Sequence, residues 1–265
     1  MRRLCLAAFV VMGAAVPAGA QEWAKKRVDE SRRHIEWVEV KNGDRNVKCT
    51  IAFPEVKEKA TAVIVIHEIF GLSDWVRSMT DELAEQGYIA IAPDLLSGMA
   101  PGGGGTKELK GGDVRDAIFK LPPEQILKDL DAVYEHVSKL DSCNGKVVVC
   151  GFCWGGGQTF RYANHNDKIK AAFPFYGSAP NKAEGVAKIA CPVYGFFAEN
   201  DMRINGGLQK AEELFKEANK KFEPVIYEGG GHGFMRGGAD PNGKAGDKKA
   251  REEAWKRWKD LLKKV

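Results

Sequence analysis

The chain has 265 residues and carries 40 lysine and arginine residues against 36 aspartate and glutamate residues, a formal net charge of +4. So small an excess of positive charge gives no reason to expect a nucleic-acid partner. The length is enough for one large α/β domain or two small ones.

The first twenty residues are typical of a secretory signal peptide. Arg2 and Arg3 form a basic start, the apolar run 4–16 follows, and Ala18-Gly19-Ala20 is a small-x-small cleavage site. The apolar run is shorter than the roughly 20 residues that span a bilayer. We therefore expect cleavage before Gln21 and export to the periplasm or the extracellular space, without stable membrane insertion. An uncleaved anchor is the alternative, and the arginine pair leaves the twin-arginine route open beside the general one.

After this segment, strand and helix patterns alternate. The stretch 34–55 alternates apolar and polar residues on either side of Asn42-Gly43, which predicts an antiparallel hairpin. Apolar runs typical of buried parallel strands follow at 60–68, 88–94, 146–152, 171–177, 192–201 and 224–232. Amphipathic helices are expected at 74–87, 123–140, 207–221 and 248–264. This order predicts right-handed crossovers and a mostly parallel sheet, and we expect residues 21–265 to form a single α/β domain.

One stretch of low complexity interrupts this order, at Gly98–Gly112. Its run of glycines is not followed by the G-K-[ST] of a phosphate-binding loop. We expect a flexible loop, and loops of this length often border a site.

The stretch "VVVCGFCWGGG" has two incompatible interpretations. Cys150 and Cys153 have the C-x-x-C spacing of redox pairs, whereas Gly151-Phe152-Cys153-Trp154-Gly155 is a nucleophile elbow with cysteine in place of serine. The apolar run before Cys150 makes it a strand residue, and three residues of extended chain separate Cα atoms by up to about 10 Å, too far for a disulfide. The elbow also explains the glycines that flank Cys153, since such a turn needs positions without a Cβ.

A base and an acid stand downstream in the order that an elbow requires. Asp201 ends an apolar strand, and His232 lies in a turn just after the next strand. Nucleophile, acid and base in that chain order are typical of the α/β-hydrolase arrangement. The other histidines lack this placement and are expected to be structural: His34, His67, His136 and His165. No histidine and cysteine spacing suits a metal, so neither metal nor cofactor is expected.

These motifs together resemble the dienelactone hydrolase family. The resemblance rests on "HEIFGL" after the first buried strand, "APD", "GFCWGG", the strand-end Asp201 and "GGGHGF", and it runs from about residue 35 to the C-terminus. It implies an α/β-hydrolase fold with Cys153 as nucleophile, His232 as base and Asp201 as the acid that orients the base. It also implies that Glu68 holds the resting thiol.

The resemblance further implies how a substrate is bound. The backbone N–H groups of Trp154 and Ile69 should receive the oxyanion, and Arg236 matches one of two arginines that hold a substrate carboxylate. The position of the second arginine is occupied by Gly98. The expected substrate is therefore a small ester or lactone rather than a dienelactone specifically, and the expected assembly is a monomer.

Two other classes of function are open from the sequence. An exported thiol–disulfide oxidoreductase would use Cys150 and Cys153, and Cys191-Pro192 would supply the proline that faces a redox pair. A binding protein on an inactive hydrolase scaffold would keep the fold without the reaction. Five cysteines remain after cleavage, an odd number, and their pairing cannot be assigned from sequence.

Overall fold

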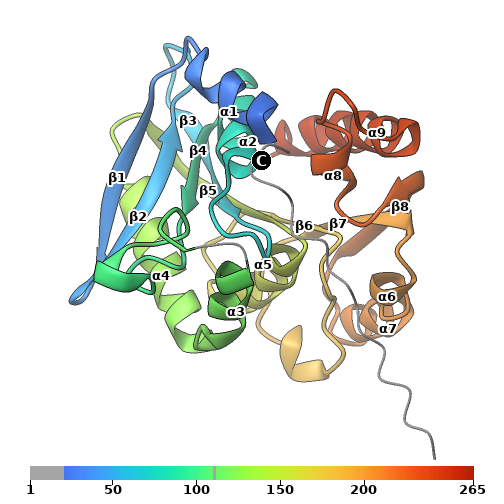
Figure 1. Cartoon of the computed structure of the whole chain (residues 1–265). Coiled ribbons are helices and arrows are strands. Elements are labelled where there is room, and N and C mark those ends of the chain that lie inside the picture. The colour runs from blue at the N-terminus through green and yellow to red at the C-terminus, as the bar shows by residue number, and fades with distance from the viewer. Residues whose placement is uncertain (1–20, 110–111) are drawn as a thin grey trace, which may run out of the picture.

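The computed structural model describes residues 21–109 and 112–265, and the expected signal peptide lies outside them. The described residues form an eight-stranded sheet in the order β1-β2-β4-β3-β5-β6-β7-β8. Figure 1 shows β1 and β2 at one edge of this sheet and β8 at the other. The strands are β1 Ile35–Asn42, β2 Arg45–Ala52, β3 Ala60–Ile66, β4 Ile89–Pro93, β5 Cys143–Phe152, β6 Ala172–Phe175, β7 Val193–Asn200 and β8 Phe222–Gly231. Each predicted strand is confirmed.

The N-terminal hairpin is antiparallel, as predicted, but its turn lies one residue further on. Asn42 is the last residue of β1 and pairs with Arg45, so Gly43 and Asp44 make the turn. Gly43 has a φ of 59°, which glycine adopts without strain. Strand β2 then pairs antiparallel with β4, and β3 to β8 pair in parallel.

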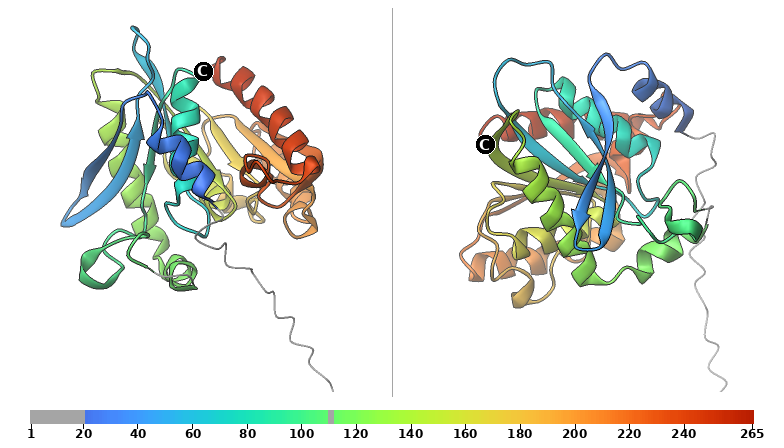
Figure 2. Two further views of the ribbon diagram at one scale, coloured as in Figure 1. Left: turned by 45° about the horizontal axis from the view of Figure 1, so that its top comes forward. Right: turned by 90° about the vertical axis from the view of Figure 1, so that its left-hand side faces the viewer.

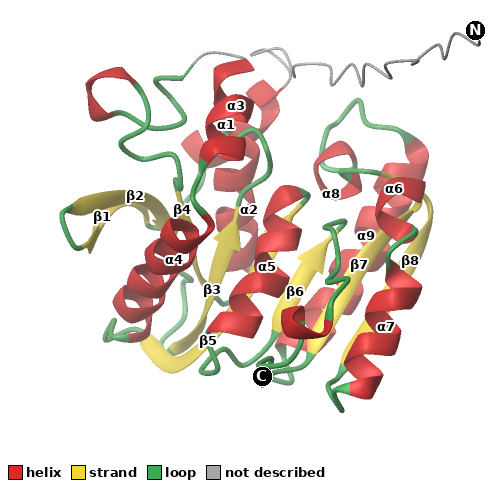
Figure 3. Cartoon of the chain, turned by 90° about the horizontal axis from the view of Figure 1, so that it is seen from below, coloured by secondary structure: helices red, strands yellow, loops and turns green. Residues whose placement is uncertain are grey.

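Helices cover both faces of the sheet. Figure 3 shows α4, α5 and α7 in front of it and α2 and α9 behind. Apolar side chains of the first group, such as Leu130 and Phe160, pack against one face. Trp75 of α2 and Trp258 of α9 pack against the other. The longer helices are α1 Glu22–Asp29, α2 Asp74–Glu85, α3 Gly112–Lys120, α4 Pro123–Ser138, α5 Trp154–His165, α7 Leu208–Glu217 and α9 Ala245–Leu262.

Helix α5 follows the predicted nucleophile elbow, and two of the other helices, α1 and α3, were not expected from the sequence. Helix α1 lies beside α2 (Figure 2), and an ion pair holds its Arg27 against the buried carboxylate of Asp81, with Nε and Oδ2 3.0 Å apart. Helix α3 begins where the predicted loop 98–112 ends. The other short elements are η2 Pro101–Gly103, η3 Ala183–Gly185, α6 Met202–Asn205 and α8 Phe234–Gly237. Among the residues described, no helix combines the length and apolar character that crossing a membrane requires.

The described part of the loop, residues 98–109, is tied to the end of β4 through Thr106. The Thr106 backbone N–H donates to Asp94 Oδ2 over 2.7 Å, and the Thr106 hydroxyl donates to Asp94 Oδ1 over 2.7 Å. The same hydroxyl accepts a hydrogen bond from the Leu72 N–H. Leu72 belongs to the segment that follows β3, so this loop is attached to the end of the sheet where the strands β3 and β4 finish.

Candidate active site

The residues singled out by the sequence follow the carboxyl ends of neighbouring parallel strands. Glu68 follows β3, Cys153 follows β5, Asp201 follows β7 and His232 follows β8. Ligands of open α/β sheets bind outside the carboxyl ends of the strands. The topology therefore gathers these four side chains at the edge of the sheet where a site is expected.

Cys153 occupies a sharp turn between β5 and α5. Its backbone has φ 56° and ψ −116°, a conformation that residues with a Cβ rarely adopt. A Cβ on Gly151 would lie 2.2 Å from the Gly155 carbonyl oxygen, and one on Gly155 would lie 2.4 Å from the His67 carbonyl oxygen. Both contacts are with backbone, which cannot move aside. The two flanking glycines are therefore required by the close packing of this turn, as the elbow pattern predicted.

A chain of hydrogen bonds joins Cys153, His232 and Asp201. His232 Nε2 lies 3.0 Å from Cys153 Sγ, and His232 Nδ1 lies 2.5 Å from Asp201 Oδ2. The Asp201 side chain is 5% exposed and that of His232 is 32% exposed. Burial disfavours the imidazolium, but the hydrogen bonds to Asp201 and Cys153 outweigh it and raise the pKa of His232 to about 9. The imidazole is thus disposed to be protonated at neutral pH.

Glu68 lies against Arg236 rather than against the thiol. Arg236 Nε donates to Glu68 Oε2 over 2.8 Å, and the Glu68 side chain is only 2% exposed. Among the described residues the hydrogen-bond partner of Cys153 Sγ is His232. The contact between Glu68 and the thiol that the family resemblance implied is therefore not made in this structure. A buried carboxylate is stabilised far more by a guanidinium than by a thiol.

The ion pair with Glu68 also stabilises the charged form of Arg236. Its charge interaction with Glu68 raises the pKa of Arg236 above its usual value. The guanidinium lies over the ring of Phe70, with its Cζ 5.1 Å from the ring centre. Arg236, Glu68 and Phe70 therefore form one group beside the cysteine turn.

The expected oxyanion donors have free N–H groups. Trp154 is the first residue of α5, and Ile69 follows Glu68 at the end of β3. In the described part of the chain, neither backbone N–H donates a hydrogen bond to another residue. Both groups are thus available to an external acceptor, and the partial positive charge of a helix N-terminus adds to that of Trp154.

Two aromatic residues of this region were not expected from the sequence to contact the site. Tyr176 follows β6, is fully buried with a φ of 38°, and meets the His232 ring edge-to-face at 5.3 Å between centroids. Its strand "AAFPFYG" carries no motif that could have drawn attention to it. His67 was expected to be structural. It is fully buried, and its ring stacks on Trp154.

The first cysteine of the C-x-x-C pattern, Cys150, is part of the core. Cys150 lies within β5 and is fully buried, and burial raises the pKa of its thiol well above the usual value. A neutral thiol in apolar surroundings is unreactive. All the described cysteines are free: Cys49, Cys143, Cys150, Cys153 and Cys191. The redox interpretation has no support in this arrangement.

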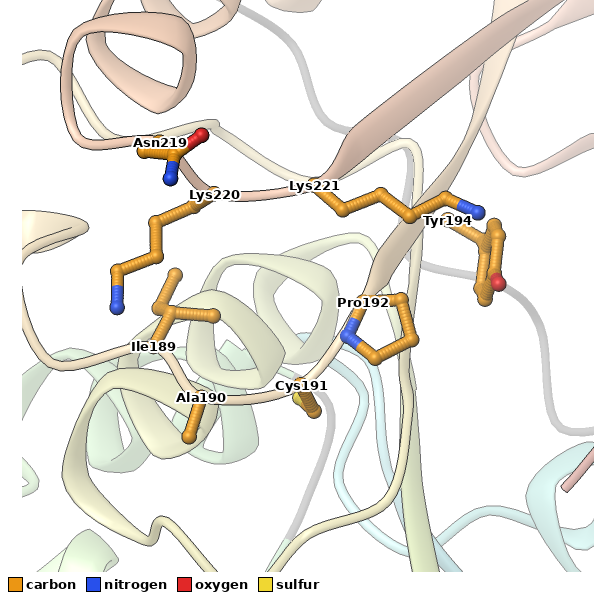
Figure 4. Close-up of a pocket in the computed structure, with 8 residues that line it drawn as sticks. All are labelled: Ile189, Ala190, Cys191, Pro192, Tyr194, Asn219, Lys220 and Lys221. Atoms are coloured by element: carbon orange, nitrogen blue, oxygen red, sulfur yellow. The ribbon is translucent and has the colours of Figure 1, made fainter.

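A surface hollow also lies away from the cysteine turn. The hollow in Figure 4, which Cys191, Tyr194 and Lys221 help to line, lies at the amino ends of β7 and β8, opposite the cysteine turn. No cluster of three or more histidine, cysteine or carboxylate side chains within the described ranges is placed to hold a metal ion.

Known proteins are similar to this chain over most of its length. The model of the dienelactone hydrolase family matches residues 47–265. A "Putative carboxymethylenebutenolidase" of Saccharolobus solfataricus is 30% identical over 257 residues, which cover 83% of this chain and 94% of that protein. A protein of the same name from Salmonella typhi is 33% identical over 192 residues, covering 65% of this chain and 67% of its own length.

Solved structures show the same fold. The crystal structure described as a "Putative Dienelactone Hydrolase" from Klebsiella pneumoniae superposes with a TM-score of 0.77 at 24% identity. The alignment covers 89% of this chain and 100% of that one. The sheet order, the helices on both faces and these matches lead to one conclusion: the chain has the α/β-hydrolase fold and belongs to the dienelactone hydrolase family, a family of ester and lactone hydrolases.

Proposed function

We propose that this protein hydrolyses small carboxylic esters or lactones through a thioester formed on Cys153. The observation that carries the proposal is the hydrogen-bonded order of Asp201, His232 and Cys153 at the cysteine turn. A nucleophile, a base within reach of it and an acid that orients the base are the parts needed for covalent acyl transfer.

The first half-reaction forms the thioester. With its pKa raised to about 9, His232 is protonated at neutral pH and places a positive charge 3.0 Å from Cys153 Sγ. The thiolate is the nucleophilic form of a cysteine. The thiolate sulfur bonds to the carbonyl carbon, and the carbonyl electron pair moves to oxygen. When the tetrahedral intermediate collapses, the carbon–oxygen bond to the leaving group breaks and His232 gives its proton to the alkoxide. The alcohol leaves, or stays attached if the substrate is a lactone.

The second half-reaction releases the acid. Neutral His232 takes a proton from water, and the resulting hydroxide adds to the thioester carbonyl. Collapse of this intermediate breaks the carbon–sulfur bond and restores the thiolate beside protonated His232. In both halves the oxyanion would accept hydrogen bonds from the free N–H groups of Trp154 and Ile69. Such a donor contributes about 3 kcal/mol to the stability of the transition state.

Arg236 supports a preference for esters that carry a carboxylate. Its Nε is taken by Glu68, and in the described part of the chain its terminal nitrogens donate to no protein group. These nitrogens offer a guanidinium fork to a substrate carboxylate. Only one of the two family arginines is present, since Gly98 occupies the position of the other. We therefore propose a carboxylic ester hydrolase of moderate selectivity for anionic substrates, exported after removal of its first twenty residues.

The test compares the activities of variants at two cysteines, Cys150 and Cys153, which are three residues apart in the sequence. We expect hydrolysis of p-nitrophenyl acetate by the wild type and by Cys150→Ala, and none above background by Cys153→Ala. Iodoacetamide should inactivate the wild type by alkylating Cys153. Loss of activity in a folded Cys150→Ala would revive the redox interpretation, and an inactive wild type across neutral and anionic esters would favour a binding protein on an inactive scaffold.

A further inference from the structure

His67 is a fully buried histidine that the proposed reaction does not use. It precedes Glu68 and Ile69 at the end of β3. We propose that His67 is a positioning residue for the oxyanion site, because it fixes the peptide that carries the Ile69 N–H and packs against the residue that carries the Trp154 N–H. This inference rests on the function proposed above.

The first contact orients the Ile69 donor. His67 Nδ1 lies 2.8 Å from the Glu68 carbonyl oxygen. That carbonyl and the Ile69 N–H belong to the same peptide group, which is planar and trans, so the two point in opposite directions. The Gly71 N–H donates to the same oxygen over 3.1 Å. With two donors holding the carbonyl on one side, the Ile69 N–H is held pointing to the other.

The second contact concerns the Trp154 donor. The rings of His67 and Trp154 are stacked, with centroids 5.4 Å apart and planes inclined by 15°. The His67 carbonyl oxygen also lies against the first turn of α5, where a Cβ on Gly155 would approach it to 2.4 Å. His67 thus contacts the segments that carry both free N–H groups.

The chemistry of the ring is suited to this task. The partner of Nδ1 is a carbonyl oxygen, which only accepts, so Nδ1 must carry the hydrogen and donate it. Burial lowers the pKa of His67, which keeps the ring neutral. Nε2 is then a lone-pair acceptor, and it has no hydrogen-bond partner among the described residues. Within the described ranges, the hydrogen bond of the His67 ring is therefore the one that orients the peptide.

Three substitutions separate this role from simple packing. His67→Phe and His67→Leu both lack the donor, so either variant tests the role if it folds. His67→Phe also keeps an aromatic ring against Trp154. His67→Asn is the matched rescue, because its amide nitrogen is close to the position of Nδ1 and can donate to the Glu68 carbonyl. Folding of each variant is checked by circular dichroism and by its urea midpoint.

Two rates on Cys153 supply the readout. Ester hydrolysis passes through an oxyanion, whereas alkylation by iodoacetamide displaces iodide from carbon and forms none. Misplacing an oxyanion donor costs about 10- to 100-fold in rate, so His67→Phe should lose about that much in kcat on p-nitrophenyl acetate with little change in KM. Its alkylation rate should stay within about threefold of the wild type, and His67→Asn should recover most of the loss, since it restores the donor that orients the peptide.

Three results would overturn the inference: unchanged hydrolysis in His67→Phe or His67→Leu, an equal fall in hydrolysis and alkylation, or a folded His67→Asn that is as slow as His67→Phe. An equal fall would mean that His67 only supports the turn as a whole. Failure of the proposed function looks different, since the wild type itself would not hydrolyse esters or Cys153→Ala would remain active.

Discussion

Replacing Cys153 by glycine and, separately, by alanine tests whether the turn between β5 and α5 is strained. With φ 56° and ψ −116°, Cys153 holds a conformation that is open to glycine but unfavourable for any residue with a Cβ. Both variants lack the sulfur and its hydrogen bond to His232, and alanine alone keeps the Cβ. The difference in stability between them therefore reports the backbone strain at this position. No substrate is needed.

The expected difference follows from two opposing terms. A residue held in a sparsely populated region costs about 1–3 kcal/mol, which glycine would relieve. Glycine loses about 0.5–1 kcal/mol relative to alanine because its unfolded chain is more flexible. Cys153→Gly should therefore be more stable than Cys153→Ala by about 1 kcal/mol, after both terms are counted.

Urea unfolding of the mature protein, followed by tryptophan fluorescence, measures the difference. The control pair is Lys210→Gly and Lys210→Ala on the exposed face of α7. There glycine should be the less stable by about 1 kcal/mol, the ordinary helix propensity. If the pair at Cys153 shows the same sign as the pair at Lys210, the cysteine turn is not strained and the reasoning fails.

Three further predictions concern charge and processing. The pKa of His232 rises from 6.5 in the unfolded chain to about 9, so its stabilisation is complete below pH 6.5 and is lost as the pH rises through 9. The unfolding free energy should fall by up to about 3 kcal/mol over that interval, which is an upper value because the side chain is partly exposed. In His232→Gln this fall should be absent or small. A wild-type curve that shows no fall would contradict the raised pKa of His232. Arg236→Ala should lower kcat/KM for a carboxylate-bearing ester about ten- to a hundredfold more than for a neutral acetate at the same pH and ionic strength, and equal losses would show that Arg236 does not sense substrate charge. N-terminal sequencing of the native protein should begin near Gln21, whereas an uncleaved cytoplasmic chain would refute export.

The site residues that could be predicted from the sequence are those marked by the residues next to them in the chain. Cys153 is marked by the glycines of its turn, and Asp201 and His232 each follow an apolar strand. In a parallel sheet such strands end at one edge, so their order along the chain is enough to bring the three residues near one another. Their mutual distances agree with this expectation, while their catalytic roles stay predictions.

Contacts made at long range could not be predicted in the same way. Glu68 and Arg236 are 168 residues apart, and nothing in either segment indicates that the carboxylate pairs with the guanidinium rather than with the thiol. Helix α1 has few apolar residues and is held through Arg27 by a carboxylate of α2. His67 illustrates the same point, since its contact with Trp154 depends on how α5 lies against β3.

The burial of four thiols has a practical consequence for counting sites. Cys49, Cys143, Cys150 and Cys191 are buried and unbridged, and Cys153 alone among the described cysteines is partly exposed. In the chain that begins at Gln21, a chromogenic thiol reagent should therefore titrate one sulfhydryl per native molecule and four more after denaturation. The native count measures the fraction of competent molecules in a preparation before any substrate is known. Because no disulfide joins the described cysteines, the protein can be purified and stored under reductant without losing a covalent link.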